Sequence, residues 1–194
     1  AAESALSEPA VARALAEHLP PGAQLTVSSS MPIRDLEWFG GRAASAHSNR
    51  GANGIDGVVS TALGRALGRP AKTSPEFVLI GDLAFVHDSN ALVALTRRAV
   101  DLRIVVVDND GGGIFHMLPI ADHEPDFTLF FATPHGLDFQ HAAAMHNIPF
   151  RDCDIAALDE AVGQALDSAG SCVIRVRTER AESTKRRRDV ADAV

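Results

Sequence analysis

Two polar side chains, Asp82 and Asn109, each follow a short apolar run of the chain and could bind a metal ion. Asp82 comes two positions after the run 77–80, and Asn109 comes two positions after the run 104–107. If both runs are parallel strands, their carboxyl ends lie where open α/β sheets bind ligands. Carboxylate and amide oxygens suit Mg²⁺, which usually shares its coordination shell with substrate phosphates. Polar residues are also common turn formers at strand ends, so a pair of ordinary turns is the alternative.

A run of three glycines, Gly111, Gly112 and Gly113, follows Asn109 almost directly. Backbone N–H groups without side chains beside them can wrap an anion, so the run strengthens the case for a phosphate ligand. The run does not form a G-x-x-x-x-G-K-[ST] phosphate loop. The chain also lacks a G-x-G-x-x-G motif at the start of a helix, which gives nicotinamide binding little support.

The alternation of apolar runs with helical patterns predicts the elements that would position these groups. The runs 77–80 and 104–107 are apolar at every position, as in strands buried on both faces of a parallel sheet. Further strands are expected at 24–28, 148–150 and 172–176, and helices are expected to begin near positions 8, 58, 82, 138 and 154. We therefore predict an α/β fold, a three-layer sandwich with a doubly wound, mainly parallel central sheet and helices on both faces.

The 194 residues are expected to form one domain, 1–194, with a basic tail from about 180 to 194. The charged run Lys185–Arg188 in that tail is interpreted as a solvated segment, and contact with an acidic partner is the alternative. The chain begins with Ala1 rather than Met, and we expect it to be a piece of a longer protein.

Composition excludes several classes of partner. The formal net charge of -7 argues against nucleic acid as the main ligand. No apolar run approaches the roughly 20 residues that a membrane helix needs, so no membrane insertion is expected. The first residues lack the basic start and apolar core of a signal peptide, which favours the cytoplasm. Cys153 and Cys172 match no metal or redox spacing and are expected to be reduced and packed.

The spacing of the polar groups resembles the fingerprint of thiamine-diphosphate-dependent enzymes. In that family a Gly-Asp-Gly triplet is followed, after a spacer, by two asparagines. The matching residues here are 81–83, a gap of 24 residues, and Asp108-Asn109. The resemblance implies that Asp82, Asn109 and the backbone carbonyl of Gly111 bind Mg²⁺, or Mn²⁺, which bridges to the cofactor diphosphate. Leu83 and Asp108 depart from the pattern, but neither corresponds to a metal ligand.

Within that family, four segments look like the MenD enzymes, the 2-succinyl-5-enolpyruvyl-6-hydroxy-3-cyclohexene-1-carboxylate synthases of menaquinone biosynthesis. The segments are 48–57, 81–83, 109–115 and 141–145. The resemblance covers nearly the whole chain, but only the C-terminal, diphosphate-binding domain of those enzymes. It implies a transferase that decarboxylates 2-oxoglutarate and adds the remaining unit to isochorismate.

The resemblance also implies partners. The pyrimidine-binding domain of a neighbouring subunit, in a homodimer or homotetramer, would supply the glutamate that activates the cofactor. No catalytic residue is therefore expected in this chain, and the isolated chain is expected to be inactive.

Site residues carried over from the resemblance fall into two groups. The cofactor-binding group is Ser30, Ile55, Gly81, Asp82, Leu83, Ala84, Asn109, Gly111, Gly112, Gly113 and Ile114. The substrate-binding group is Ser30, Arg34, Arg50, Phe115 and Leu118. Ile55 would be the apolar wedge that bends the cofactor, and as a plain residue it would be part of the core. Arg34 and Arg50, expected on loops, would pair with substrate carboxylates, although a single loop arginine is usually a solvated charge.

Two other functions remain open at this point. One is another thiamine-diphosphate enzyme, such as an acetolactate synthase or a 2-oxo-acid decarboxylase, although the Arg34 and Arg50 pair favours a more anionic substrate. The other is a non-catalytic, Mg²⁺-dependent diphosphate-binding module. Loss of cofactor binding on replacement of Asp82 would support the metal site in either case.

Overall fold

A parallel sheet of six strands forms the centre of the computed structural model, which describes residues 7–41, 45–69, 75–98 and 100–193. The strand order is β2-β1-β3-β4-β6-β5, and every neighbouring pair is parallel. The strands are β1 (Gln24–Val27), β2 (Ala46–Ser48), β3 (Glu76–Gly81), β4 (Leu102–Asp108), β5 (Phe150–Cys153) and β6 (Cys172–Arg177). This sheet confirms the predicted fold class.

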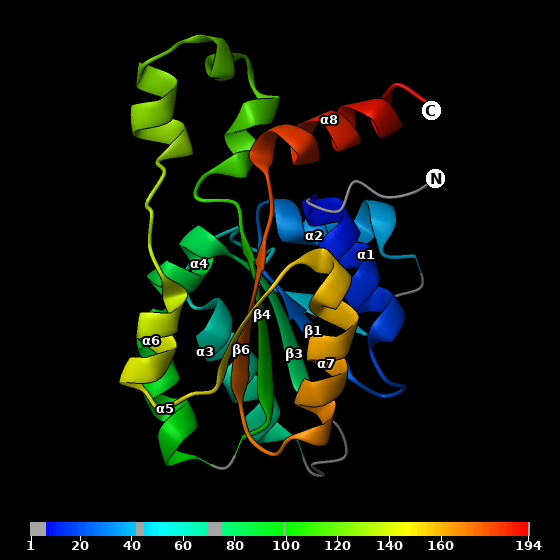
Figure 1. The fold of residues 1–194 in the computed structure, drawn as a ribbon, viewed down its shortest axis with the longest axis vertical. Helices are drawn as coiled ribbons and strands as arrows, with labels where there is room; N and C mark the ends of the chain where they lie inside the picture. The colour runs from blue at the N-terminus through cyan, green and yellow to red at the C-terminus, as the bar shows by residue number, and fades with distance from the viewer. Residues whose placement is uncertain (1–6, 42–44, 70–74, 99, 194) are drawn as a thin grey trace.

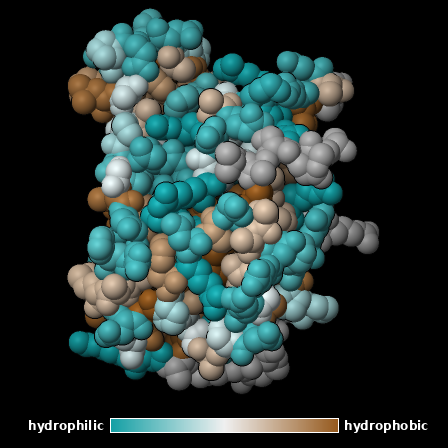
Figure 2. Space-filling view, in the orientation of Figure 1, coloured by the Kyte–Doolittle hydropathy of each residue, from teal (hydrophilic) through white to brown (hydrophobic). Residues whose placement is uncertain are grey.

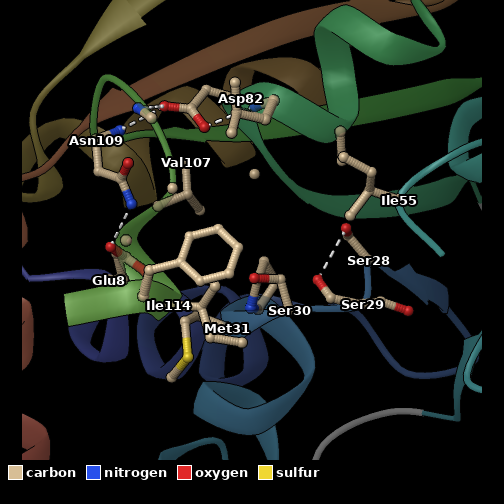
Figure 3. A pocket seen from close by; sticks show the side chains of 18 residues that line it. Glu8, Ser28, Ser29, Ser30, Met31, Ile55, Asp82, Val107, Asn109 and Ile114 are labelled. Carbon is tan, nitrogen blue, oxygen red and sulfur yellow. Dashed lines mark hydrogen bonds between the residues drawn. The ribbon is translucent and has the colours of Figure 1, made fainter. Parts of the chain in front are cut away.

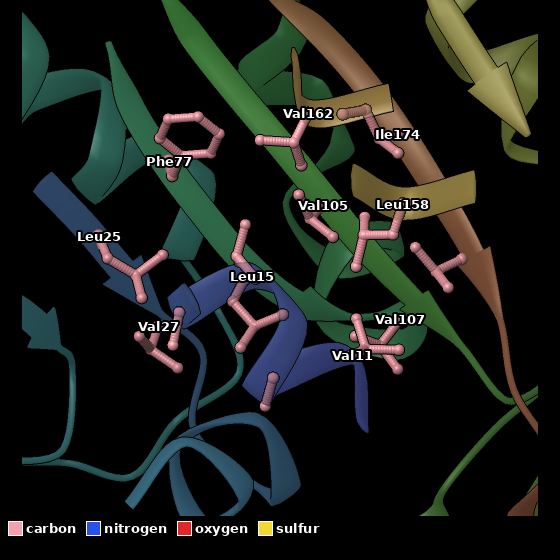
Figure 4. Close-up of a cluster of buried hydrophobic side chains, with 14 of the residues drawn as sticks. Val11, Leu15, Leu25, Val27, Phe77, Val105, Val107, Leu158, Val162 and Ile174 are labelled. Carbon is pink, nitrogen blue, oxygen red and sulfur yellow. The ribbon is translucent and has the colours of Figure 1, made fainter. Parts of the chain in front are cut away.

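The central strands β3 and β4 are buried on both faces because their side chains alternate between two apolar clusters. In β3, Leu79 belongs to one cluster, while Val78 and Ile80 belong to the other. In β4, Val105 belongs to the first cluster and Val106 to the second. Figure 4 shows the first cluster, in which side chains from the sheet meet those of two helices. Full burial of each aliphatic side chain stabilises the fold by about 1.5–3 kcal/mol.

Helices cover both faces of the sheet and complete the three layers (Figure 1). One face carries α1 (Glu8–His18), α2 (Met31–Phe39) and α7 (Leu158–Asp167). The other face carries α3 (Val58–Gly68), α4 (Asp82–His87), α5 (Leu92–Arg97) and α6 (Phe139–Met145). The predicted helix starts near positions 138 and 154 are both capped by side chains. Asp138 accepts a hydrogen bond from the Gln140 N–H at the start of α6, and Asp154 accepts one from the Ala157 N–H just before α7.

The predicted elements differ from the structure mainly at the edges of the sheet. The sequence pattern does not predict strand β2, because this strand at the sheet edge is largely exposed and has few apolar side chains. Strand β5 was predicted at 148–150 but spans Phe150–Cys153. Between β4 and α6 the chain forms the short helical segments η2 (Gly113–Met117), η3 (Pro119–Asp122) and η4 (Thr128–Ala132). In Figure 2 an apolar patch shows at the upper left, over this part of the chain, and further apolar patches show lower on the same face. Leu129 and Phe130 are among the exposed apolar residues of this segment.

The C-terminal basic segment forms a helix, α8 (Arg180–Ala191), which packs against α1 and η2 (Figure 1). The prediction of a solvated tail was wrong for Arg187, whose side chain is fully buried. Its guanidinium lies 2.6 Å from carboxylate oxygens of both Glu8 and Asp35. A buried charge is tolerated when it is paired in this way. Lys185, by contrast, is exposed as expected.

Both cysteines are free thiols, and Cys172 is buried. Across the described ranges, no helix has both the length and the apolar character needed to cross a membrane. Residues 1–6, on which the prediction about a targeting segment partly rests, lie outside the described residues.

Candidate functional site

A cavity lies at the carboxyl ends of β1, β3 and β4, where the chain order of the strands reverses between β1 and β3 (Figure 3). Ligands bind at such switch points in open α/β sheets. The lining residues are Glu8, Ser28, Ser29, Ser30, Met31, Pro32, Ile55, Gly81, Asp82, Leu83, Ala84, Val107, Asn109, Gly111, Gly112, Gly113, Ile114 and Phe115. All predicted cofactor residues are in this set, although they come from four separate stretches of the chain.

The carboxylate of Asp82 is buried at the first turn of α4 and is held by backbone N–H groups. Its Oδ2 accepts hydrogen bonds from Gly111 at 2.8 Å and from Asn109 at 3.1 Å. Its Oδ1 accepts one from Leu83 at 2.6 Å, so this oxygen retains more capacity for another ligand. Burial raises the pKa of Asp82 to about 6, although the N–H groups of Gly111 and Leu83 oppose that rise. A cation beside the carboxylate would offset the cost of its burial.

Asn109 lines the same cavity. Its Nδ2 donates a hydrogen bond of 2.6 Å to Oε1 of Glu8. Its Oδ1 is buried and has no hydrogen-bond partner among the described residues. In Figure 3 the amide nitrogen points toward Glu8, and the oxygen is on the side away from it. Since buried polar atoms are nearly always paired, this oxygen is suited to a cation or another donor.

His135 and Asp108 lie beside Asp82 and were not predicted as site residues. Nε2 of His135 is 3.3 Å from Oδ2 of Asp82. One ligand atom from each of Asp82, Asp108 and His135 falls within 4.8 Å of the others, so these three form a second possible ligand set. The charge of Asp108 also adds to the raised pKa of Asp82, after the larger effect of burial. No motif marked His135, because it approaches the site only through the fold of the 113–137 segment.

The three glycines have a different role from the one expected. Their N–H groups were expected to face an anion, but all three donate within the protein, to Asp82, to Ala132 and to the Gly111 carbonyl, respectively. Gly111 has a φ of +138°, and a Cβ there would lie 2.0 Å from the carbonyl oxygen of Ala132. The run therefore permits close packing against η4. The Gly111 carbonyl, the third predicted metal ligand, accepts the Gly113 N–H at 3.0 Å.

Apolar side chains line the cavity at several places, as Figure 3 shows for Ile55, Val107 and Ile114. Phe115 also lines the cavity, and its ring packs edge-on against Phe131 with 5.6 Å between the ring centroids. Leu118, the other predicted apolar substrate contact, is 50% exposed and lies outside the lining set within the described part of the chain.

The hydroxyl-bearing turn after β1 borders the cavity with Ser28, Ser29 and Ser30. Ser30 has a φ of 72°, which is uncommon for a residue other than glycine. Ser29 Oγ is buried without a hydrogen-bond partner among the described residues. Strained residues and unpaired hydroxyls gather at functional sites more often than elsewhere. Only Ser30 was predicted from the sequence.

The two predicted substrate arginines do not line the cavity formed by the described residues. Arg34 lies on α2 rather than on the expected loop, and its Nη1 donates a hydrogen bond of 2.5 Å to the carbonyl of Ser30. Arg50 follows β2 in a turn, and its Nη1 is buried without a partner among the described residues. Their role toward a substrate stays a prediction.

Together these residues fit a divalent cation. The site offers a buried carboxylate at Asp82, an unpaired buried amide oxygen at Asn109 and the nearby carbonyl of Gly111. All three donors are oxygens, as Mg²⁺ and Mn²⁺ prefer.

The fold and this cavity agree with a class of cofactor-dependent enzymes. Residues 40–176 match the family model described as thiamine pyrophosphate enzyme, C-terminal TPP binding domain. The chain therefore belongs to this family.

Curated relatives to which the chain is similar carry the name of one enzyme within this class. A 2-succinyl-5-enolpyruvyl-6-hydroxy-3-cyclohexene-1-carboxylate synthase of Salinibacter ruber is 49% identical over 91% of this chain and 30% of its own length. Proteins of the same name from Roseiflexus castenholzii and Halobacterium salinarum are 45% and 46% identical over 90% and 98% of this chain. The chain spans 30% and 33% of those two proteins, respectively.

Solved structures share the fold at lower sequence identity. Benzoylformate decarboxylase from Polynucleobacter necessarius has a TM-score of 0.81 and 19% identity, over 92% of this chain and 34% of that chain. The thiamine diphosphate-dependent 4-hydroxybenzoylformate decarboxylase of Rhodococcus jostii RHA1 has a TM-score of 0.75 and 18% identity, over 92% and 34%. At these identities the similarity establishes the common fold alone.

Proposed function

We propose that this chain is the diphosphate-binding domain of a 2-succinyl-5-enolpyruvyl-6-hydroxy-3-cyclohexene-1-carboxylate synthase and binds thiamine diphosphate together with Mg²⁺. The observation that carries the metal site is the unpaired, buried Oδ1 of Asn109 in the same cavity as the buried carboxylate of Asp82. The family match supports the cofactor, and the names of the relatives support the reaction.

The described residues have distinct roles in this proposal. Asp82 Oδ1, Asn109 Oδ1 and the Gly111 carbonyl hold the cation, and Mn²⁺ would fit the same donors. Ile55 and Ile114 provide apolar contacts to the cofactor, and Ser30 offers a hydroxyl. When bound, thiamine diphosphate supplies the electron sink needed to decarboxylate a 2-oxo acid.

The substrates in this proposal are 2-oxoglutarate and isochorismate, both carboxylates. Phe115 lines the apolar side of the cavity, and the buried Nη1 of Arg50 has capacity for an anion. Arg34 and Leu118 would contact substrate at the rim. The proposal includes a cytoplasmic homodimer or homotetramer in which a pyrimidine-binding domain of a neighbouring subunit completes each site.

Calorimetric titration of the chain with thiamine diphosphate tests the proposal directly. Binding is expected in the presence of Mg²⁺ and not with EDTA, and Asp82→Ala is expected to abolish it. Asp167→Ala, at an exposed site on α7, is the matched control and should bind as the wild type does. Binding that ignores both EDTA and the Asp82 substitution would contradict the metal site.

A second measurement separates the enzyme from a simple binding module. The 194-residue chain alone is expected to release no CO₂ from 2-oxoglutarate, because the activating glutamate lies in another domain. A full-length enzyme that contains this domain is expected to prefer 2-oxoglutarate over pyruvate. A preference for pyruvate would instead favour an acetolactate synthase or another 2-oxo-acid decarboxylase.

A further inference from the structure

A continuous set of buried contacts joins the C-terminal helix α8 to the floor of the cavity. Arg187 on α8 donates hydrogen bonds to Asp35 and, at 2.6 Å, to Oε2 of Glu8. The other carboxylate oxygen of Glu8, Oε1, accepts the 2.6 Å hydrogen bond from Nδ2 of Asn109. Glu8 thus contacts α8 with one oxygen and the cavity amide with the other.

The contact with Glu8 determines which end of the Asn109 amide is hydrogen-bonded within the protein and which end stays unpaired among the described residues. A carboxylate accepts hydrogen bonds and cannot donate them, so it pairs with the NH₂ group of an amide and not with its oxygen. The Asn109 oxygen is therefore left on the opposite side, where it is buried and unpaired among the described residues. An amide without this contact could turn over and place its NH₂ where the unpaired oxygen now lies.

Glu8 is itself held in place from two directions. Its backbone N–H donates to Oγ of Ser183 at 3.0 Å, and its side chain pairs with Arg187. Arg187 is in turn oriented by two hydrogen bonds to Asp35 at 2.8 Å and 2.6 Å. Paired guanidinium contacts of this kind fix geometry more tightly than a single hydrogen bond does. The carboxylate of Glu8 has little freedom to leave Asn109.

The missing side chain of Gly113 leaves room for the hydrogen-bonded pair of Asn109 and Glu8. A Cβ on Gly113 would lie 2.6 Å from Nδ2 of Asn109 and 3.2 Å from Oε1 of Glu8. Close packing against Asn109 and Glu8 therefore explains why position 113 is a glycine, without any bound anion. The packing of three elements, the start of α1, the end of β4 and α8, converges on this single hydrogen bond.

We infer that Glu8 is a positioning residue for the metal site, holding the Asn109 amide with its unpaired oxygen away from Glu8 and available to a cation, and that α8 positions Glu8 through Arg187. This inference rests on the proposed function only for the identity of the ligand, because the orientation of the amide is a property of the chain alone. Residues that orient metal ligands in this way commonly affect metal affinity about 10–100-fold.

The side-chain amide signals of Asn109 test the orientation without any ligand. The chain has five asparagines, and comparison with Asn109→Ala identifies the Asn109 NH₂ pair in a spectrum of asparagine-labelled protein. Glu8→Gln is expected to shift that pair and leave the other four unchanged. Glu17→Gln, at an exposed position on α1, is the matched control and should shift none of them. An Asn109 pair that is unchanged in Glu8→Gln overturns the inference.

A metal titration tests the consequence for binding. Mn²⁺ affinity in the presence of thiamine diphosphate, followed by electron paramagnetic resonance, is expected to fall about 10–100-fold in Glu8→Gln. Arg187→Lys, which keeps the charge but not the forked geometry, is expected to give a smaller loss and to provide the second variant if Glu8→Gln does not fold. Equal Mn²⁺ affinity in the wild type and in the folded variants overturns the inference. A wild-type chain that binds no Mn²⁺ with thiamine diphosphate would refute the proposed function, and the amide signals would still decide the orientation.

Discussion

The carboxylate of Asp82, at the end of β3, accepts a 2.8 Å hydrogen bond from the backbone N–H of Gly111, which follows β4. Together with the bond from the Asn109 N–H, this contact ties the loops at two adjacent strand ends to each other. Hydrogen bonds to an ionised group are stronger than those between neutral groups. These hydrogen bonds therefore hold the two loops around the cavity together without any bound cation.

Replacement of Asp82 by Asn is expected to change how stability depends on pH. The pKa of the carboxyl is about 6 in the folded chain and near 3.8 when exposed, so between these values the folded state holds a proton that the unfolded state lacks. The contribution of Asp82 to stability is thus full below about pH 4 and declines as the pH rises through 6. Relative to the wild type, Asp82→Asn should gain about 3 kcal/mol in free energy of unfolding between pH 4 and pH 7.

Denaturant unfolding at several pH values measures this difference. Asn at 82 also loses hydrogen bonds from backbone N–H groups, but that loss is the same at every pH and shifts the whole curve. Asp167→Asn, at an exposed position on α7, provides the comparison. A constant difference between wild type and Asp82→Asn across this range would show that burial does not raise the pKa of Asp82.

Gly113→Ala is expected to destabilise the fold by about 1–3 kcal/mol, because the added methyl group meets the hydrogen-bonded pair of Asn109 and Glu8. Gly64→Ala is the matched control, since a Cβ there meets nothing within 4 Å and Gly64 lies inside α3. That change should stabilise the chain by up to about 1 kcal/mol. Thermal unfolding monitored by circular dichroism gives both values. Equal effects of the two substitutions would argue against the close packing at Gly113.

Arg187→Met is expected to destabilise the chain by about 3–5 kcal/mol, because it leaves Glu8 and Asp35 buried without their cation. Lys185→Met on the same helix removes an exposed pair with Asp189 and should leave the unfolding midpoint nearly unchanged. Urea unfolding of the two variants separates a buried ion pair from a solvated basic tail. Similar midpoints for both would restore the interpretation of this segment as solvated.

Ser30→Gly is expected to be more stable than Ser30→Ala by about 1–3 kcal/mol, because only glycine adopts the positive φ of this position without strain. Both variants lack the hydroxyl, so both should lose the same amount of affinity for thiamine diphosphate with Mg²⁺. Calorimetry and thermal unfolding on the same samples separate strain from ligand contact. If the two variants bind with clearly different affinity, the backbone conformation rather than the hydroxyl determines the contribution of Ser30.

Much of the fold and half of the site follow from local patterns in the sequence. Short β-branched runs that are apolar at every position favour strands buried on both faces, and parallel strands place the residues after them at one edge of the sheet. The arrival of Asp82 and Asn109 in one cavity is a direct consequence of that geometry. The edge strand β2 was missed because an exposed, polar strand lacks the apolar pattern on which the prediction depends.

The sequence by itself determined the central strands, the two polar side chains that follow them and the class of ligand that those groups suit. Only the tertiary structure decided how the groups are oriented. Glu8 contacts Asn109 across 101 residues of sequence, and Arg187 contacts Glu8 across 179. The glycine N–H groups turned out to be bonded within the protein, to Asp82, to η4 and to Gly111 itself. Such contacts depend on how distant segments pack together, and no local periodicity encodes them.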